Sequence, residues 1–326
     1  VVTDMWQALD ADAAQVDPTV PGNLVSHQTY SHGDPESAKK RAFRVVEATF
    51  HQQRQTHVPI ETRGCAALWD PGRDHLTFHV GTQVPHPLRT QLAQRLKLSE
   101  SQVTVISPDV GGSFGQKIAL YREELTVAAL ARHLKRPVRW REDRLENLTA
   151  AANSREDFCR TRAAVDEHGT LLALDLEMRE DFGAYCFFPA NYLARVVAMI
   201  LSGPYRLQDY AFDVKVVLSH KCGNAPMRAP MSITSWVMDG TMDAIARELA
   251  LDPVEVRRRN LLTSEELPYR TATGELLADI TPSQTFEAVV TAIEYRTFRE
   301  RQQAARAARR YLGLGLCNVV EPTTYG

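Results

Sequence analysis

Apolar residues recur in the first part of this chain with two different spacings. They alternate with polar residues over 42–50 and 76–83, which predicts two strands. Leu88, Leu92 and Leu96 repeat every four residues instead, after two prolines that suit the first turn of a helix. The pattern therefore predicts two strands followed by a helix.

A glycine-rich loop separates the next predicted strand from the next predicted helix. β-Branched residues over 103–106 indicate a buried strand. The apolar positions after this loop share one face of a helix: Leu120, Val127, Ala128, Ala131 and Leu134. The loop itself is VGGSFGQK at 110–117, and its glycines permit a close approach of the backbone to a ligand. Because it leads straight into the helix, we expect it to offer N–H groups and a positive dipole end to an anion.

The middle of the chain predicts a β-hairpin. A short strand is expected in PVRWRED at 137–143. The turn DEHG at 166–169 then joins the alternating runs FCRTRAAV and LLALDLEM. A further strand over 210–220 precedes the loop GNAPMRAPM. Strands therefore dominate this region.

Helices dominate the last part of the chain. One is predicted over 232–249, and Asp252 and Pro253 are typical of the N-cap and first position of another. A long helix is expected from 283 to about 311, and the apolar alternation of 312–326 predicts the start of a strand. Because strands and helices alternate irregularly, we expect an α+β architecture with mixed sheets.

Composition narrows the class of protein. With 326 residues, 44% of them hydrophobic, the chain can bury a sizeable core. The 38 basic and 40 acidic residues give a net charge of -2, so we expect neither nucleic acid nor a membrane as a partner. No apolar run approaches the ~20 residues of a transmembrane helix, and the first residues lack the pattern of a signal peptide. We therefore expect a cytoplasmic protein.

The cysteines and histidines do not predict a metal site made by the protein itself. The five cysteines are dispersed, and no two have the Cys-x-x-Cys spacing that holds zinc or an iron–sulfur cluster. The ten histidines are scattered among polar neighbours, which favours solvated or hydrogen-bonding roles. We expect no direct metal ligation by the protein.

The glycine loop does not fit either of two common nucleotide-binding motifs. A P-loop requires Gly-Lys-Ser/Thr, but Gln116 separates Gly115 from Lys117 here. The dinucleotide fingerprint requires glycines at its first, third and sixth positions, a spacing that Gly111, Gly112 and Gly115 do not have. An ordinary strand-to-helix turn is the remaining alternative, so neighbouring motifs must decide.

Several other segments accompany the loop in a fixed order. GTQVPHPLR places Gln83 at a strand end, THVPIETRG adds a polar turn, and NAPMRAPM places Arg228 in a loop stiffened by prolines. Together with DVGGSFGQK and with ELALDPVEVRRRNLL at 248–262, these segments resemble the molybdenum-cofactor subunit of the xanthine dehydrogenase and aldehyde oxidoreductase family, which also includes aerobic carbon monoxide dehydrogenases. The similarity covers 21–262 and returns at 313–321.

The resemblance implies a molybdenum–molybdopterin cofactor, in the cytosine dinucleotide form, whose metal is held by the pterin. It implies that Gln83 donates an amide hydrogen bond to a molybdenum oxygen and that Arg228 borders the metal, both as residues of the catalytic centre. The remaining cofactor-binding positions implied are Gly112, Ser113, Phe114, Gly115 and Ala229. Amide and backbone donors can orient an oxo group without displacing ligands.

The resemblance also limits the substrate. Purine-oxidising members carry a Glu where this chain has Ile118 and an Arg opposite Tyr210, and carbon monoxide dehydrogenases carry a Cys where it has Ala229. A pocket bordered by Ile118, Tyr210 and Pro230 would suit an aldehyde or an aromatic heterocycle. The reaction implied takes its oxygen from water and passes a hydride from the substrate carbon to a sulfido ligand of the metal.

The resemblance further predicts how the chain is organised. Residues 1–35 would be an extended segment leading into the domain, or an interdomain linker, because prolines and glycines lie there among polar residues. Residues 36–265 would form the first lobe of the cofactor-binding region. Residues 266–326 would be a helical connection and the start of a second lobe.

Two family segments do not occur in this sequence: Gly-Gln-Gly, which helps hold the pterin, and Gly-Val-Gly-Glu, which supplies the general base. Glu61 and Glu123 are expected to have structural or solvated roles instead. We therefore expect the chain, whether a split subunit or a fragment, to require a chain with the second lobe, an iron–sulfur subunit and an FAD subunit. The alternative is a noncatalytic protein that binds a pterin or nucleotide for cofactor storage or insertion.

Overall fold

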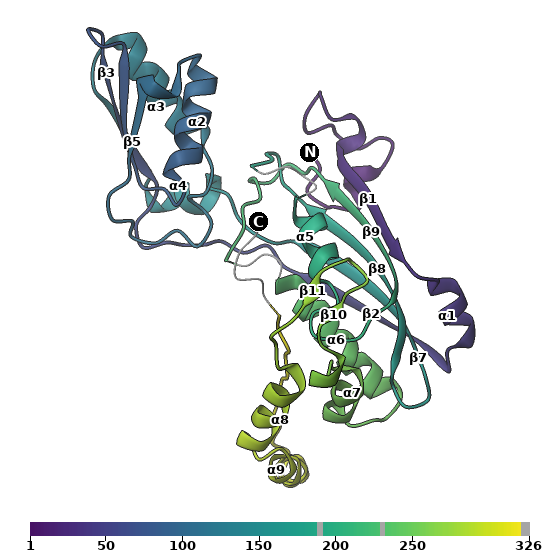
Figure 1. Cartoon of the computed structure of the whole chain (residues 1–326). Helices are drawn as coiled ribbons and strands as arrows, with labels where there is room; N and C mark the ends of the chain where they lie inside the picture. The colour runs from purple at the N-terminus through teal and green to yellow at the C-terminus, as the bar shows by residue number, and fades with distance from the viewer. Residues whose placement is uncertain (188–191, 229–231, 321–326) are drawn as a thin grey trace.

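The computed structural model describes residues 1–187, 192–228 and 232–320. Within these residues the chain forms a five-stranded sheet, a four-stranded sheet and a two-stranded ribbon. The two larger sheets belong to separate units joined by extended segments (Figure 1). Parallel and antiparallel pairs occur in both, which confirms the predicted α+β architecture with mixed sheets.

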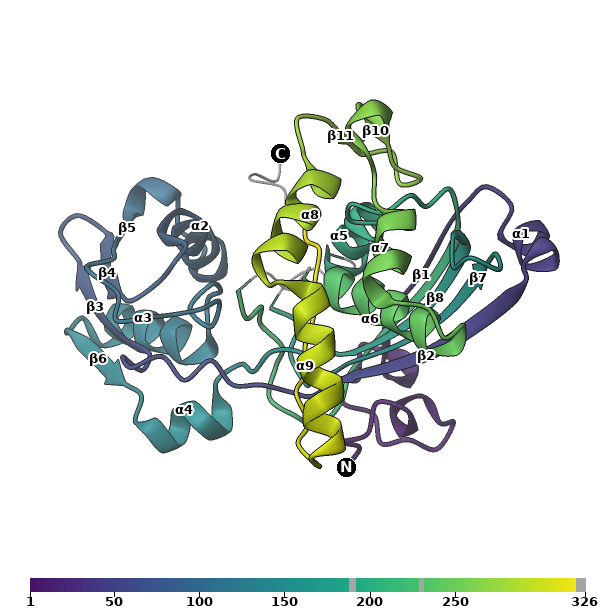
Figure 2. The same cartoon turned by 90° about the horizontal axis from the view of Figure 1, so that it is seen from below.

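The larger unit is built on the five-stranded sheet. Its strands, in spatial order, are β1 (Leu24–His32), β9 (Asp209–Val217), β8 (Leu171–Asp181), β7 (Asp157–Val165) and β2 (Arg44–Gln52). The predicted hairpin is confirmed, because β7 and β8 pair antiparallel on either side of the turn. Three helices lie on one face of the sheet (Figure 2): α5 (Tyr192–Ile200), α6 (Ile233–Glu248) and α7 (Pro253–Asn260). The main hydrophobic core lies between these helices and the sheet.

The smaller unit is built on the four-stranded sheet. Its strands, in spatial order, are β5 (Val103–Ile106), β4 (His75–Val80), β3 (Gly64–Asp70) and β6 (Val138–Arg141). The predicted apolar stripe is confirmed in α2 (Pro85–Leu96), whose Leu88 and Leu92 share a buried core with the sheet. In α3 (Arg122–Leu134) it is confirmed for Val127, Ala128 and Ala131, but Leu120 precedes the helix and Leu134 is exposed. A short helix, α4 (Arg144–Ala150), leads back to the larger unit.

The smaller unit is an insertion between two neighbouring strands of the larger one. β2 and β7 pair antiparallel, and Gln52 at the end of β2 lies opposite Asp157 at the start of β7. The chain therefore leaves the larger unit and returns to it at adjacent points. The segments 53–63 and 151–156 make this double connection, and the loops considered below lie beside them.

The segment 1–35 differs from the prediction. It contains two 3₁₀ turns, at Gln7–Leu9 and Pro21–Asn23, and the whole of strand β1. The helix α1 (Pro35–Arg41) follows at once. Strand β1 was missed because it is an edge strand: it pairs with β9 alone, and its residues are exposed or half-buried, so apolar alternation is weak. Leu24–His32 is therefore part of the sheet and not of a linker.

The C-terminal region also differs from the prediction. The ribbon of β10 (Tyr269–Arg270) and β11 (Leu276–Leu277) precedes it. The expected long helix is two helices, α8 (Pro282–Ala292) and α9 (Tyr295–Ala307), because Glu294 between them has a left-handed φ of 49°. The strand expected in 312–326 is absent from 312–320, the part of it that the structure describes.

A buried ion pair fixes the return of the chain from β6 to α4. The Arg63 side chain is 1% exposed and that of Glu142 is fully buried. Nε and Nη2 of Arg63 donate to Oε1 of Glu142 at 3.0 and 2.6 Å, and the Arg63 backbone N–H donates to Oε2 at 3.0 Å. The Tyr121 ring covers the guanidinium at 3.9 Å. Such a pair is held by its hydrogen bonds as much as by its charges.

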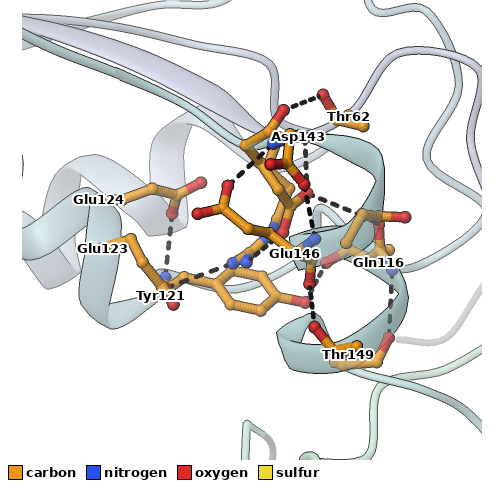
Figure 3. Close-up of polar contacts among 12 residues, drawn as sticks. Thr62, Gln116, Tyr121, Glu123, Glu124, Asp143, Glu146 and Thr149 are labelled. Atoms are coloured by element: carbon orange, nitrogen blue, oxygen red, sulfur yellow. Dashed lines mark hydrogen bonds and ion pairs between the residues drawn. The ribbon is translucent and has the colours of Figure 1, made fainter.

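This ion pair extends to the end of the glycine loop. Asn147 Nδ2 donates to Glu142 Oε2 at 2.7 Å and to Gln116 Oε1 at 2.9 Å, and the Tyr121 hydroxyl donates to the Gln116 carbonyl at 2.6 Å. Gln116 Nε2 donates to the carbonyl of Ala152 at 3.2 Å. Figure 3 shows Gln116 and Tyr121 beside the helix that carries Glu146 and Thr149. The network thus anchors the residue that follows Gly115.

A second buried cluster lies where the larger sheet meets the connection. Asp157 and Glu180 face each other across β7 and β8, and both are almost completely buried. Burial raises the pKa of each carboxyl group, and Asp157 raises that of Glu180 further; Arg155 and Arg54 only partly offset this. The pair therefore favours a protonated state over two carboxylates.

We predict that Glu142→Gln strongly destabilises the protein. It leaves the buried Arg63 guanidinium with only the partly exposed Glu123, 3.4 Å away, as a balancing charge, so the free energy of unfolding should fall by about 3 kcal/mol. Urea denaturation measures this change. The matched control is Glu248→Gln, which breaks an ion pair with Arg44 whose side chains are about half exposed; the loss there should be below about 1 kcal/mol. Equal losses would contradict the role given to the buried pair.

We also predict that Asp157→Asn changes how stability depends on pH. Burial raises the folded-state pKa of Asp157, so the folded protein binds a proton that the unfolded chain releases, and stability falls as pH rises between about 4 and 7. The asparagine variant lacks this loss. Denaturation at pH 5 and pH 8 should therefore show the variant gaining stability relative to the unchanged protein at the higher pH. A difference independent of pH would refute the assignment.

Candidate functional site

Gln83 lies in the short connection between β4 and α2. Its backbone N–H donates to the Lys117 carbonyl at 2.9 Å. Its side-chain Oε1 accepts a hydrogen bond from the backbone N–H of Gly115 at 3.0 Å and another from the Ser113 hydroxyl. Because a backbone N–H can only donate, this contact identifies which end of the amide is oxygen. The exposed Gln83 side chain keeps its Nε2 donors, which bond to no other described residue.

The glycine loop has an unusual backbone at three positions. Gly112, Phe114 and Gly115 have φ values of 98°, 58° and 109°. The buried Ser113 hydroxyl also accepts from the Lys117 N–H at 2.8 Å, which closes the loop on itself. The left-handed φ values suit glycine and are costly for Phe114, so the surrounding contacts must hold that residue in place.

The prediction that this loop leads straight into a helix is wrong. α3 begins only at Arg122, and residues 116–121 separate it from Gly115. The Glu124 side chain accepts a hydrogen bond from the Tyr121 N–H at 3.0 Å and caps the helix. An acidic residue of the helix itself thus balances the positive end of the helix dipole. Only the backbone N–H groups of the loop remain available to bind a ligand.

A second loop, which carries Arg228, packs directly on the glycine loop. The Arg228 N–H donates to the Phe114 carbonyl at 2.8 Å, and its guanidinium lies over the Phe114 ring at 5.3 Å. A Cβ atom placed on Gly115 would lie 1.7 Å from the carbonyl oxygen of Pro226. Only glycine fits at this contact. The structure therefore brings Gln83, Phe114, Gly115 and Arg228 together, from three separate segments.

Glu61 ties a further segment to the glycine loop. Its Oε2 accepts from Lys117 Nζ at 2.6 Å and from the Gly111 N–H at 2.9 Å. Burial raises the pKa of Glu61, but these two donors outweigh it and bring the pKa below its usual value. Glu123 lies 3.4 Å from Arg63. Both acids thus have partners within the protein, as their expected structural roles require.

The structure separates one predicted pocket residue from this site. Tyr210 is 3% exposed and lies in the hydrophobic core at the start of β9. The Arg228 loop follows the opposite end of that strand, so placing Tyr210 in a substrate pocket was wrong. Ile118 is half-buried and follows Lys117 in the glycine loop. Ala229 and Pro230 lie outside the described residues.

Two residues that contact the Arg228 loop were missing from the sequence prediction. His57 Nε2 bonds to the Pro226 carbonyl at 2.7 Å, and Arg155 Nη2 donates to the Met227 carbonyl at 2.9 Å. Burial lowers the pKa of His57. Pro59, two residues after His57, marks an ordered turn, which was the one available signal; nothing local indicates its distant partner.

This arrangement offers three side-chain groups to a ligand and is held in place mainly by backbone contacts. It combines an oriented amide donor at Gln83, an exposed cation at Arg228 and a half-exposed aromatic face at Phe114. In the described parts of the chain, no group of three or more His, Cys, Asp and Glu side chains could hold a metal ion. The site can orient an oxygen-bearing group by hydrogen bonds and stack on a flat one. None of the described helices is long and apolar enough to cross a membrane.

Known proteins are similar to this chain in sequence and in fold. The chain is 33% identical to the nicotine 6-hydroxylase large subunit of Paenarthrobacter nicotinovorans over 306 residues, which cover 92% of this chain and 37% of the relative. It is 29% identical to the carbon monoxide dehydrogenase large chain of Hydrogenophaga pseudoflava, covering 98% of this chain and 42% of the relative. Each relative is thus more than twice as long as the matched part.

A solved structure is also similar to this chain. The quinoline 2-oxidoreductase of Pseudomonas putida 86 superposes with a TM-score of 0.88 at 32% identity, covering 94% of this chain and 39% of that one. Residues 16–261 match the molybdopterin cofactor-binding domain family, and this range includes every described residue of the site. The chain therefore belongs to the molybdopterin cofactor-binding domain family.

Proposed function

We propose that this chain provides one wall of the active site of a molybdenum hydroxylase that oxidises an N-heteroaromatic substrate, or an aldehyde, with water as the oxygen donor. The single observation that carries the proposal is the fixed amide of Gln83. Its oxygen is held by the Gly115 N–H and the Ser113 hydroxyl, which leaves its N–H donors for a ligand. Family membership supports a molybdopterin as that ligand.

The residues of the site fit such a group. Bound molybdenum–molybdopterin would supply the centre that takes two electrons from the substrate. Gln83 Nε2 would donate to an oxygen of the group, and the backbone of Gly112 and Ser113 would approach it closely. Phe114 and Gly115 would pack beside it, while Arg228 and Ala229 would border it. All these contacts orient the group and leave its metal coordination unchanged, which suits a metal held by the pterin.

A flat, uncharged ring is the substrate that the site favours. Phe114 offers a half-exposed aromatic face, and Ile118 occupies the place where purine-oxidising enzymes carry a glutamate in the resemblance described above. Two of the relatives are named for nicotine and quinoline, which are nitrogen heterocycles. In the sequence, Ala229 stands in place of the cysteine of carbon monoxide dehydrogenases, which argues against that substrate. An N-heteroaromatic is therefore preferred to an aldehyde.

Further chains or domains would complete the enzyme. The relatives are named as a large subunit and a large chain, which supports a complex of several polypeptides. We propose an iron–sulfur subunit and an FAD subunit as the path for electrons, and a second lobe that carries the general base. The cofactor would be the cytosine dinucleotide form. Residues 36–265 would be the first lobe and 266–326 the connection to the second, with Leu24–His32 now added to the first.

We predict that Gln83→Ala lowers kcat by about a hundredfold, the size typical of one lost donor at a reacting oxygen. Molybdenum and pterin content should be retained, because the other contacts persist. Steady-state kinetics and metal analysis of the purified holoenzyme measure both. The control is Gln91→Ala, an exposed residue on α2, which should leave both unchanged. A preparation that binds a nucleotide or pterin but never contains molybdenum would overturn the proposed function in favour of a storage or insertion protein.

We also predict that Gly115→Val prevents cofactor retention. The new Cβ would overlap the Pro226 carbonyl and force the two loops apart, and the φ of 109° is unsuitable for valine. Molybdenum and pterin should therefore be lost from the purified protein. Gly313→Val is the control, since no atom lies within 4 Å of a Cβ built there. Full cofactor content in Gly115→Val would show that this loop does not border the cofactor.

A further inference from the structure

His57 is a buried side chain that the proposed function leaves without a role. It lies in the connection between β2 and β3 and is 7% exposed. Its Nε2 lies 2.7 Å from the Pro226 carbonyl oxygen, which can only accept a hydrogen bond, so the proton is on Nε2. Burial and the nearby Arg155 cation lower the pKa of His57. The ring therefore donates from Nε2 to the Pro226 carbonyl group, and the backbone of Ala152 is a second hydrogen-bond partner of the ring.

That carbonyl group is the point of contact between the two loops of the site. It packs on Gly115 so closely that no Cβ fits there. The N–H of Gly115 in turn donates to Gln83 Oε1 at 3.0 Å. A continuous series of contacts thus leads from His57 through Pro226 and Gly115 to the amide whose orientation the site depends on.

The loop needs such a donor because no backbone N–H of the described residues donates to the Pro226 carbonyl. Pro226 has no N–H, and Arg228 has a left-handed φ of 54°. Arg155 holds the next carbonyl, that of Met227, at 2.9 Å. Two side chains from the connecting segments therefore anchor two successive carbonyl groups, but only the one held by His57 abuts Gly115.

We propose that His57 is a positioning residue: by holding the Pro226 carbonyl against Gly115, it fixes the orientation of the Gln83 amide at the cofactor. This inference rests on the proposed function for its effect on turnover. The contact itself does not depend on that function. A purely structural histidine would affect stability but would have no special relation to Gln83.

A double-mutant cycle in the holoenzyme tests the relation to Gln83. His57→Leu removes the donor and should lower kcat roughly tenfold with little change in KM, because orientation and not substrate binding is lost. His57→Gln places an N–H donor near the position of Nε2 and should restore most of the activity. If His57 acts through Gln83, adding His57→Leu to Gln83→Ala should lower kcat no further. Fully multiplicative losses would overturn the proposal.

Hydrogen exchange of backbone amides gives a readout that needs no activity. His57→Leu should speed exchange at the Gly115 and Arg228 N–H groups, whereas exchange in the distant hairpin of β7 and β8 should not change. The control is His79→Leu, an exposed histidine on β4. Unchanged exchange at both amides would refute the contact series. Faster exchange in a protein that lacks molybdenum would support the series, and only the proposed function would then fail.

Discussion

The buried pair of Arg63 and Glu142 is the interaction on which the site depends most. The Asn147 side chain donates hydrogen bonds to both Glu142 and Gln116. Gln116 is the residue directly after Gly115. The glycine loop is therefore positioned by charges buried in the smaller unit, some distance along the chain from the residues that would touch a ligand. A buried ion pair contributes little net stability compared with apolar packing, but it allows one geometry only. Here the geometry of the ion pair fixes, through Asn147 and Gln116, the position of the glycine-loop backbone.

The insertion of the smaller unit explains why the site forms where it does. Gln83 and the glycine loop belong to that unit, whereas the Arg228 loop follows β9 of the larger one. Since the two connections leave and return beside each other, the loops of both units meet at the junction. His57 and Arg155, one on each connection, bond to the loop of the larger unit. The site thus lies at the junction of the two units, and residues of the connecting segments bond to the loop of the larger unit.

The sequence predicted the strands, helix ends and motifs that are determined by neighbouring residues. Alternation identified β2, β4, β7 and β8. The capping residue Asp252 marked the start of α7, and its side chain accepts a hydrogen bond from a backbone N–H of that helix. The ordered motifs brought Gln83, Gly115 and Arg228 to one site. Tyr210 was wrongly placed in a substrate pocket, although the pattern of its strand indicates a core position. It lies on the same face of β9 as the buried Phe212 and Val214, because side chains two residues apart share a face of a strand. His57 could not be found, because its partner is far away in sequence.

The contact between the two loops has a consequence for how such a site can diversify. It is made by backbone atoms: the Arg228 N–H with the Phe114 carbonyl, and the Pro226 carbonyl with Gly115. Apart from glycine at 115 and the His57 side chain that holds the Pro226 carbonyl, these contacts require no particular side chain. In the proposed active site, mutation could therefore exchange the side chains that face a substrate while the backbone contacts beside the cofactor stay in place. Single substitutions that change substrate preference would then not require loss of the cofactor.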